Sequence, residues 1–124
     1  MPSAIPPTLH QFVLFAPDVK GAPRTSLHKQ HRQYMRPLID SGVVKVAGPM
    51  IAPESFDSNT TVITQESFQS KDTAFGSIVI YEGESLEAVW KIVKGDIYYT
   101  SGVWDHDRLT LLHFVPGTPW PLPL

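Results

Sequence analysis

The sequence has 124 residues, enough for a single folded domain with one hydrophobic core. Its formal net charge of −2 and its pI near 6.2 exclude the strongly basic surface typical of nucleic-acid binding. The chain has no cysteine, which excludes disulfide bonds, thiolate metal ligands and a cysteine nucleophile.

No apolar run approaches the roughly 18–20 residues that a membrane-spanning helix needs. The first residues, MPSAIPPTLH, lack the basic and apolar regions of a secretory signal. We therefore expect a cytoplasmic protein with no membrane and no nucleic-acid partner. Prolines gather near both ends of the chain, and we predict that residues 1–8 and 116–124 are tails of a single domain spanning 1–124.

The first predicted element is a strand over residues 9–16, LHQFVLFA, which Pro17 ends. A helix is then predicted from residue 25 to residue 42. Its apolar side chains recur at helical spacing, at Leu27, Tyr34, Met35 and Leu38.

The ends of this helix also carry signals. Thr25 or Ser26 can cap its first free N–H groups, and Gly42 supplies a left-handed stop. Pro37 removes one helical hydrogen bond, so we expect either a kink or two short helices meeting at Arg36.

The middle of the chain predicts two strands separated by an insertion. Residues 43–49, VVKVAGP, form the second predicted strand, and 74–81, AFGSIVIY, form the third. The polar stretch 50–73 between them has the length of a lid or of an insertion bearing its own strand, for which 60–64, TTVIT, is the candidate.

The second helix has the clearest pattern in the sequence. Ser85 is a good N-cap, lysines stand near the other end, and Gly95 follows. Four apolar residues share one predicted face: Leu86, Val89, Trp90 and Val93. After a linking segment, residues 108–115 predict the last strand.

This order of elements is βαββαβ with an insertion between strands 2 and 3. It predicts an α+β, ferredoxin-like fold, with a four-stranded antiparallel sheet and two helices on one face. Apolar residues occur at both odd and even positions of the strands, so both faces of the sheet are expected to be apolar. The face without helices must then be buried by something else. We therefore expect a homodimer packed sheet to sheet.

The residue that suggests chemistry is His31, because it lies in the apolar stripe of the first helix. A buried imidazole needs hydrogen-bond partners, and Asp96, just past the second helix, is the best candidate. A carboxylate beside an imidazole orients it for general-base catalysis. Two plainer interpretations stay open: His31 could bond a backbone carbonyl, and Asp96 could cap a turn.

The other histidines have simpler interpretations. We expect His10 and His113 to be wall residues of the sheet, with a pocket role for His113 as the alternative, and His106 to lie in a solvated turn. His28 and His31 have a spacing that can bind a metal. No third ligand is compelling, however, so no metal site is predicted and His28 is expected to be exposed.

Several stretches together resemble the YCII-related family of the dimeric α+β barrel superfamily. The family pattern combines Arg, H-x-x-Y-L, a glycine-ended helix, an L-L-A-G-P-like strand, a later G-S strand, S-L-E-E-A, and D-P-[YF]-x-x-x-G-hydrophobic-[FW]. This chain matches it, over residues 10 to 115, at Arg24, His31–Met35, Gly42, Val46–Pro49, Gly76–Ile80, Ser85–Ala88 and Asp96–Trp104. Ile97 in place of proline, the long 50–73 insertion and the proline-rich tail depart from it.

The resemblance implies a cofactor-free lyase or isomerase in which His31 and Asp96 form a catalytic pair. The substrate would be a small, aromatic or polyketide-like molecule, and the reaction an elimination, isomerisation or decarboxylation; one family member is a dehydrochlorinase of chlorinated hydroxyquinols. Arg24 would steady an enolate or carboxylate. Tyr34, Tyr99 and Trp104 would form an aromatic wall, unless they are ordinary core aromatics.

Two other functions stay open on the sequence. One is a non-catalytic ligand-binding or accessory module with the same pocket. The other is a cofactor-independent monooxygenase, which oxygen consumption would reveal.

Overall fold

The computed structural model describes residues 8–52 and 74–118. Its elements in chain order are β1 (His10–Pro17), α1 (Arg24–Asp40), β2 (Val44–Ile51), β3 (Ala74–Gly83), α3 (Leu86–Lys94), α4 (Ile97–Thr100) and β4 (Thr110–Phe114). The predicted tails, most of the 50–73 insertion and its candidate strand at 60–64 lie outside the described residues.

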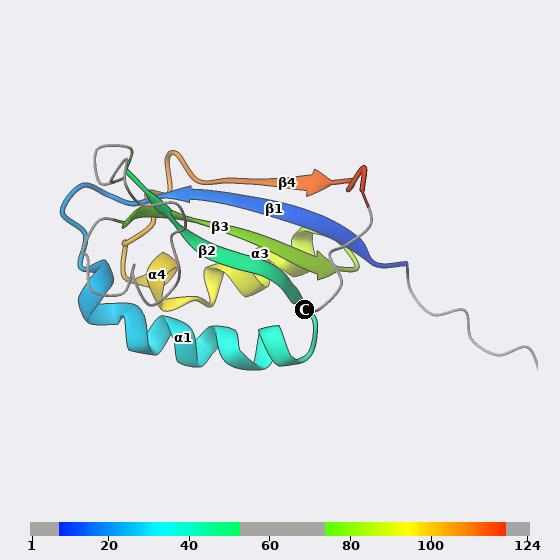
Figure 1. Ribbon diagram of the computed structural model, residues 1–124, viewed down its shortest axis with the longest axis horizontal. Coiled ribbons are helices and arrows are strands. Elements are labelled where there is room, and N and C mark those ends of the chain that lie inside the picture. Colours follow the sequence, from blue (N-terminus) through cyan, green and yellow to red (C-terminus); the bar gives the residue numbers. More distant parts are fainter. Residues whose placement is uncertain (1–7, 53–73, 119–124) are drawn as a thin grey trace, which may run out of the picture.

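The four strands form one antiparallel sheet in the order β2-β3-β1-β4. The helices lie together on one face of this sheet (Figure 1). This arrangement confirms the predicted ferredoxin-like α+β fold. The order follows from the two βαβ halves. Helix α1 connects β1 to β2, and β3 of the other half lies between them; α3 connects β3 to β4, and β1 lies between those two.

The core lies between the sheet and the helices. Phe12 pairs with Tyr81 and Leu14 with Val79, and all four side chains point to the helix side, where they are buried. The helices contribute Met35, Val89 and Val93, and the segment after α3 contributes Tyr98, Val103 and Trp104. The buried side chains that alternate along the strands therefore pack against the apolar faces of the helices, as the sequence pattern predicts.

Helix α1 differs from the prediction at its start. It begins at Arg24, and Pro23 occupies the capping position without a side-chain hydrogen bond. The predicted hydroxyl cap was therefore wrong: Ser26 instead donates its hydroxyl to the carbonyl of Pro23. Proline is tolerated at this position because the first N–H groups of a helix have no helical partner, so the N–H that proline lacks is not needed.

The far end of α1 matches the sequence more closely. The helix is continuous through Pro37, so the alternative of two short helices was wrong. Pro37 is exposed and lies in the last turns, where the loss of one hydrogen bond is tolerated. Gly42 has a φ of +83°, which confirms the left-handed stop.

Helix α3 and the segment after it place the residues of the candidate site. The Ser85 hydroxyl accepts a hydrogen bond from the backbone N–H of Ala88 at 3.0 Å, which confirms the predicted cap. Val89 and Val93 are fully buried, whereas Leu86 is 42% exposed, so the apolar face is narrower than expected. The short helix α4 was not predicted.

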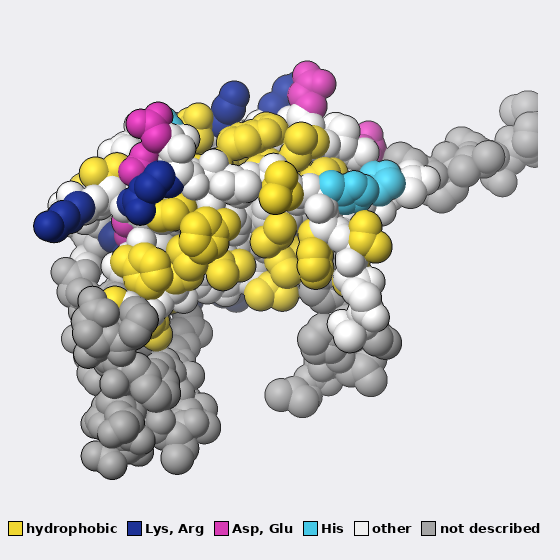
Figure 2. All heavy atoms as spheres, turned by 90° about the horizontal axis from the view of Figure 1, so that it is seen from above, with side chains coloured by type: hydrophobic (Ala, Val, Ile, Leu, Met, Phe, Trp, Pro, Cys, Tyr) yellow, Lys and Arg dark blue, Asp and Glu magenta, His cyan; other side chains and the backbone are white. Residues whose placement is uncertain are grey.

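The face of the sheet opposite the helices is apolar. Figure 2, which views the molecule from the sheet side, shows hydrophobic side chains gathered across it. Phe15, Ile78 and Leu112 are 45%, 38% and 58% exposed, and register places Phe15 beside Ile78. Among the described helices, none is long and apolar enough to cross a membrane.

Candidate active site

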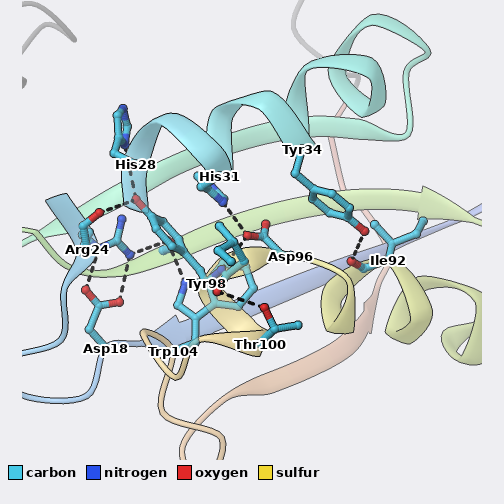
Figure 3. A network of polar contacts seen from close by, with 12 residues as sticks. Asp18, Arg24, His28, His31, Tyr34, Ile92, Asp96, Tyr98, Thr100 and Trp104 are labelled. Carbon is cyan, nitrogen blue, oxygen red and sulfur yellow. Dashed lines mark hydrogen bonds and ion pairs between the residues drawn. The ribbon is translucent and has the colours of Figure 1, made fainter. Parts of the chain in front are cut away.

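The structure brings His31 of α1 to Asp96, which lies directly before α4 in the two-residue joint between α3 and α4 (Figure 3). Nδ1 of His31 lies 2.8 Å from Oδ1 of Asp96, whose side chain is fully buried, while the His31 side chain is 14% exposed. An ionised carboxylate only accepts hydrogen bonds, so Nδ1 carries the proton of this contact. Nε2 has no hydrogen-bond partner among the described residues.

Asp96 is held from a second side by the backbone. Its Oδ1 also accepts the N–H of Tyr98 at 2.9 Å and so caps α4. Asp96 therefore caps a turn and contacts the imidazole with the same oxygen. Oδ2 is buried with no hydrogen-bond partner within the described part of the chain. A carboxylate buried in this way is expensive to maintain for structure alone.

Two aromatic rings fix the plane of the imidazole. Tyr98 stacks on His31 with ring centroids 4.0 Å apart and planes 7° apart, and Trp104 meets His31 edge-on at 6.1 Å. Both aromatic residues are fully buried. Burial is also the main reason that the pKa of Tyr98 is raised to about 12, so its hydroxyl stays neutral at physiological pH. The sequence analysis missed Tyr98, although it stands at the [YF] position of the D-P-[YF] motif.

Arg24 occupies a polar cluster on the other side of Tyr98. Its Nε and Nη2 donate to the two carboxylate oxygens of Asp18 at 2.6 and 3.0 Å. Nη2 also donates to the hydroxyl of Ser77 at 2.6 Å, and the Trp104 indole donates to the same oxygen at 3.2 Å. The guanidinium carbon lies 4.8 Å from the centre of the Tyr98 ring.

These contacts hold the guanidinium rigidly while leaving one end open. Among the described residues, Nη1 of Arg24 has no hydrogen-bond partner. Sequence reasoning missed Asp18 and Ser77, since only the fold joins β1, β3 and the start of α1. The G-S pair at the start of a strand was the one available signal for Ser77.

The first turns of α1 are electropositive. No Asp or Glu occurs between Val19 and Ile39, whereas Arg24 and Arg32 flank the histidines. The pKa of His28 is lowered, first by burial and then by the positive charges of Arg32, His31 and Arg24. The first turns of α1 therefore carry an excess of positive charge.

The remaining predicted site residues lie in different surroundings. Tyr34 donates its hydroxyl to the carbonyl of Ile92 at 2.6 Å, close to Asp96 but not against the imidazole. Tyr99 faces away from the pair and stacks on His106 at 3.9 Å. The substrate-binding roles of Arg24, Tyr34, Tyr99 and Trp104 stay predictions.

The other histidines have local partners. His28 is exposed, as expected, and its Nδ1 lies 3.4 Å from the Tyr98 hydroxyl. His113 stacks on Phe12 and meets His10 edge-on at 5.0 Å, while His106 bonds the carbonyl of Tyr99. Within the described residues, no group of three or more His, Cys, Asp or Glu side chains could hold a metal ion.

This chain is similar to known proteins in domain, sequence and structure. The YCII-related domain matches residues 10–112. Fusaric acid biosynthesis protein 2 of Gibberella moniliformis is 29% identical over 108 residues, covering 86% of this chain and 93% of the relative. Protein YciI of Escherichia coli is 33% identical over 97 residues, covering 77% of this chain and 88% of the relative.

A solved structure has the same fold. It is 5-chloro-2-hydroxyhydroquinone dehydrochlorinase from Burkholderia phenoliruptrix in complex with 2,5-dihydroxybenzoquinone. The TM-score is 0.66 at 21% identity, over 86% of this chain and 95% of that chain. The domain match spans most of the sequence, so this chain belongs to the YCII-related family.

Proposed function

We propose that this protein is a small enzyme that needs no cofactor and uses His31 as a general base or acid, with Asp96 as its partner. The proposal rests mainly on the 2.8 Å contact between Nδ1 of His31 and the buried carboxylate of Asp96. This contact leaves Nε2 as the proton acceptor of a ring that Tyr98 holds in plane. Orientation of this kind is what general-base catalysis by histidine requires.

In the proposed step, Nε2 of His31 takes a proton from an acidic C–H or a phenolic O–H. The Asp96 carboxylate stabilises the imidazolium that forms without taking the proton itself. In an elimination, the electrons of the former C–H bond form a double bond while the leaving group departs with its own pair. In an isomerisation, the imidazolium returns the proton to another atom of the substrate.

Arg24 is proposed to stabilise the negative charge that develops on a substrate oxygen. Asp18 and Ser77 hold its guanidinium in place, and the N–H groups of Nη1 are left to donate. A donor fixed before reaction stabilises an oxyanion without the cost of reorganising. The electropositive start of α1 supports the same choice of an anionic or readily ionised substrate.

The substrate class rests on the relatives. The structural neighbour is named as a dehydrochlorinase of a chlorinated hydroxyhydroquinone and was solved with a dihydroxybenzoquinone. We therefore propose hydroxylated aromatic or quinone-like molecules, with polyketide-like β-dicarbonyl compounds as the related class. All have C–H or O–H groups acidic enough for an imidazole base.

The test is an exchange and turnover assay in deuterium oxide. The purified protein would be incubated with a panel of chlorinated hydroxyquinols, dihydroxyquinones and β-keto acids, followed by proton NMR and by halide release. We expect deuterium uptake or product formation with at least one member. His31→Gln should reduce the rate by roughly 10²–10⁴-fold, which is the usual contribution of a general base.

His113→Gln is the matched control, because His113 lies on β4 and packs against Phe12 rather than near Asp96. It should leave the rate unchanged. Equal rates in wild type and His31→Gln would contradict the proposal. Saturable binding without turnover would favour a ligand-binding module, and oxygen uptake would favour a monooxygenase.

We also propose that a second copy of the chain covers the open face of the sheet. Phe15 and Ile78 are paired across β1 and β3 and are about two-fifths exposed. Leu112 of β4, opposite Val13, lies on the same face and is 58% exposed. An apolar surface of this extent on a small protein indicates an interface. Sheet-to-sheet packing of two identical faces satisfies twofold symmetry.

A further inference from the structure

A second contact between α1 and the α3–α4 joint lies beside the His31–Asp96 contact. Tyr34 follows His31 by three residues on α1, and Gly95 directly precedes Asp96. Residues three apart lie on the same face of a helix. The pairs His31–Asp96 and Tyr34–Gly95 therefore join the same two segments in adjacent places, and Figure 3 shows Tyr34 reaching from α1 toward Ile92 near the end of α3.

Gly95 is not required by the backbone conformation. Its φ of −84° and ψ of −11° lie in the right-handed helical region, which every residue type adopts. What it provides is space. A Cβ at this position would lie 2.5 Å from the Tyr34 hydroxyl oxygen and 3.2 Å from the ring carbon that bears it.

The end of the Tyr34 ring is anchored where it passes Gly95. Its hydroxyl donates to the carbonyl of Ile92 at 2.6 Å, and the N–H of Gly95 reaches the same carbonyl at 3.2 Å. Tyr34 thus satisfies one of the last carbonyls of α3, a group that a helix end leaves without a full partner. Burial, and then the charge of Asp96, raise the pKa of Tyr34, in keeping with a hydroxyl close to that carboxylate.

We propose that Gly95 and Tyr34 are positioning residues that set the spacing at which His31 reaches Asp96. The inference rests on the proposed function for the importance of that spacing. Ordinary contact begins at 3.4 Å, so a Cβ at residue 95 would displace the Tyr34 hydroxyl by about 1 Å. If α1 moved with it, the 2.8 Å contact would lengthen by a similar amount, beyond the range of a good hydrogen bond.

The experiment follows the proton on Nδ1 of His31 by NMR of ¹⁵N-labelled protein. A proton shared with a carboxylate gives a downfield resonance that is lost when the contact opens. We expect this resonance in the wild type and its loss in Gly95→Ala. The double variant Tyr34→Phe/Gly95→Ala removes the hydroxyl oxygen at 2.5 Å and leaves the ring carbon at 3.2 Å, a contact that a shift of a few tenths of an ångström relieves. The resonance should therefore return.

Gly83→Ala is the matched control. Its Cβ would lie 2.7 Å from Cγ2 of Val89, so it meets a comparably tight contact at the packing of α3 on β3. This substitution is expected to lower stability while leaving the His31 resonance in place.

Four results would overturn the positioning role: retention of the resonance in Gly95→Ala, no recovery in the double variant, its loss in Gly83→Ala as well, or its absence from the wild type. The last would also remove the basis of the proposed function. The resonance could also respond to the substitutions as expected while the protein is inactive on every substrate of the panel. That result would contradict the proposed function and leave the positioning role intact.

Discussion

Asp96→Asn is the most informative substitution, because the two oxygens of this carboxylate have different surroundings. Oδ1 accepts from both His31 and the Tyr98 backbone, whereas Oδ2 has no partner among the described residues. An asparagine must therefore place its amide oxygen at Oδ1, since its NH₂ group there would oppose the N–H of Tyr98. The imidazole then keeps its orientation while the negative charge is lost.

The magnitude follows from the number of hydrogen bonds that lose their charge. Hydrogen bonds to charged groups contribute about 1.5–3 kcal/mol and neutral ones about 0.5–1.5, so each of the two bonds at Oδ1 weakens by about 1 kcal/mol. The NH₂ group at Oδ2 adds about 1–3 kcal/mol for an unpaired buried donor. Relief from burying a charge offsets part of this, and we expect a loss of about 2–4 kcal/mol in the free energy of unfolding.

The same substitution should slow proton transfer less than the loss of His31 does. The amide oxygen still accepts from the imidazolium, so the loss of its negative charge weakens this stabilisation by about 1–1.5 kcal/mol, which corresponds to a rate lower by roughly five- to tenfold. Urea denaturation and the deuterium exchange rate measure the two effects. Asp40→Asn is the control, because Asp40 lies exposed at the far end of α1, where it pairs with Arg36. A variant as active as wild type would refute the electrostatic role of Asp96.

Three further predictions concern the rest of the fold. The folded-state pKa of Tyr98, about 12, exceeds its usual value, so the stability contributed by its neutral form is complete below pH 10 and is lost as the pH rises toward 12. Denaturation at pH 8 to 11 should show this decline. Tyr98→Phe should make the decline shallower, while Tyr34, whose pKa is also raised, continues to contribute to it. Ser85→Ala removes the cap of α3 and should lower the free energy of unfolding by about 0.5–2 kcal/mol in urea titrations, whereas an unchanged midpoint would mean that the cap contributes nothing. Phe15→Lys should halve the mass seen in sedimentation, and an unchanged mass would exclude this face as the interface.

The regular parts of the fold could be predicted because their signals are local. Ser85, the apolar residues of α3 and the left-handed Gly42 act within a few residues of themselves in the sequence. The burial of His31 beside Met35 follows from the period of the helix. These signals were enough to place the strands and helices in order and to predict the sheet with its helices on one face.

The contacts that complete the site join residues far apart in the chain, and spacing cannot supply them. Asp96 contacts His31 because α3 ends beside the middle of α1, and the family resemblance provided that link before the structure did. Ser77 was missed because its partners, Arg24 and Trp104, come from opposite ends of the chain.

Smaller errors have local causes. Helix α4 forms because the Asp96 side chain caps it, in a stretch too short to show a helical period. The start of α1 was misjudged because the helix begins one residue before Thr25, which leaves the capping position to Pro23, a residue without a side-chain acceptor.

The most direct test of the account is the tautomer of His31 in the wild-type protein. Long-range ¹H–¹⁵N NMR distinguishes a protonated ring nitrogen from an unprotonated one. We predict that the neutral ring of His31 carries its proton on Nδ1, facing Asp96, with Nε2 unprotonated. A neutral ring protonated on Nε2 would contradict the account, because His31 would then have no acceptor nitrogen to present to a substrate.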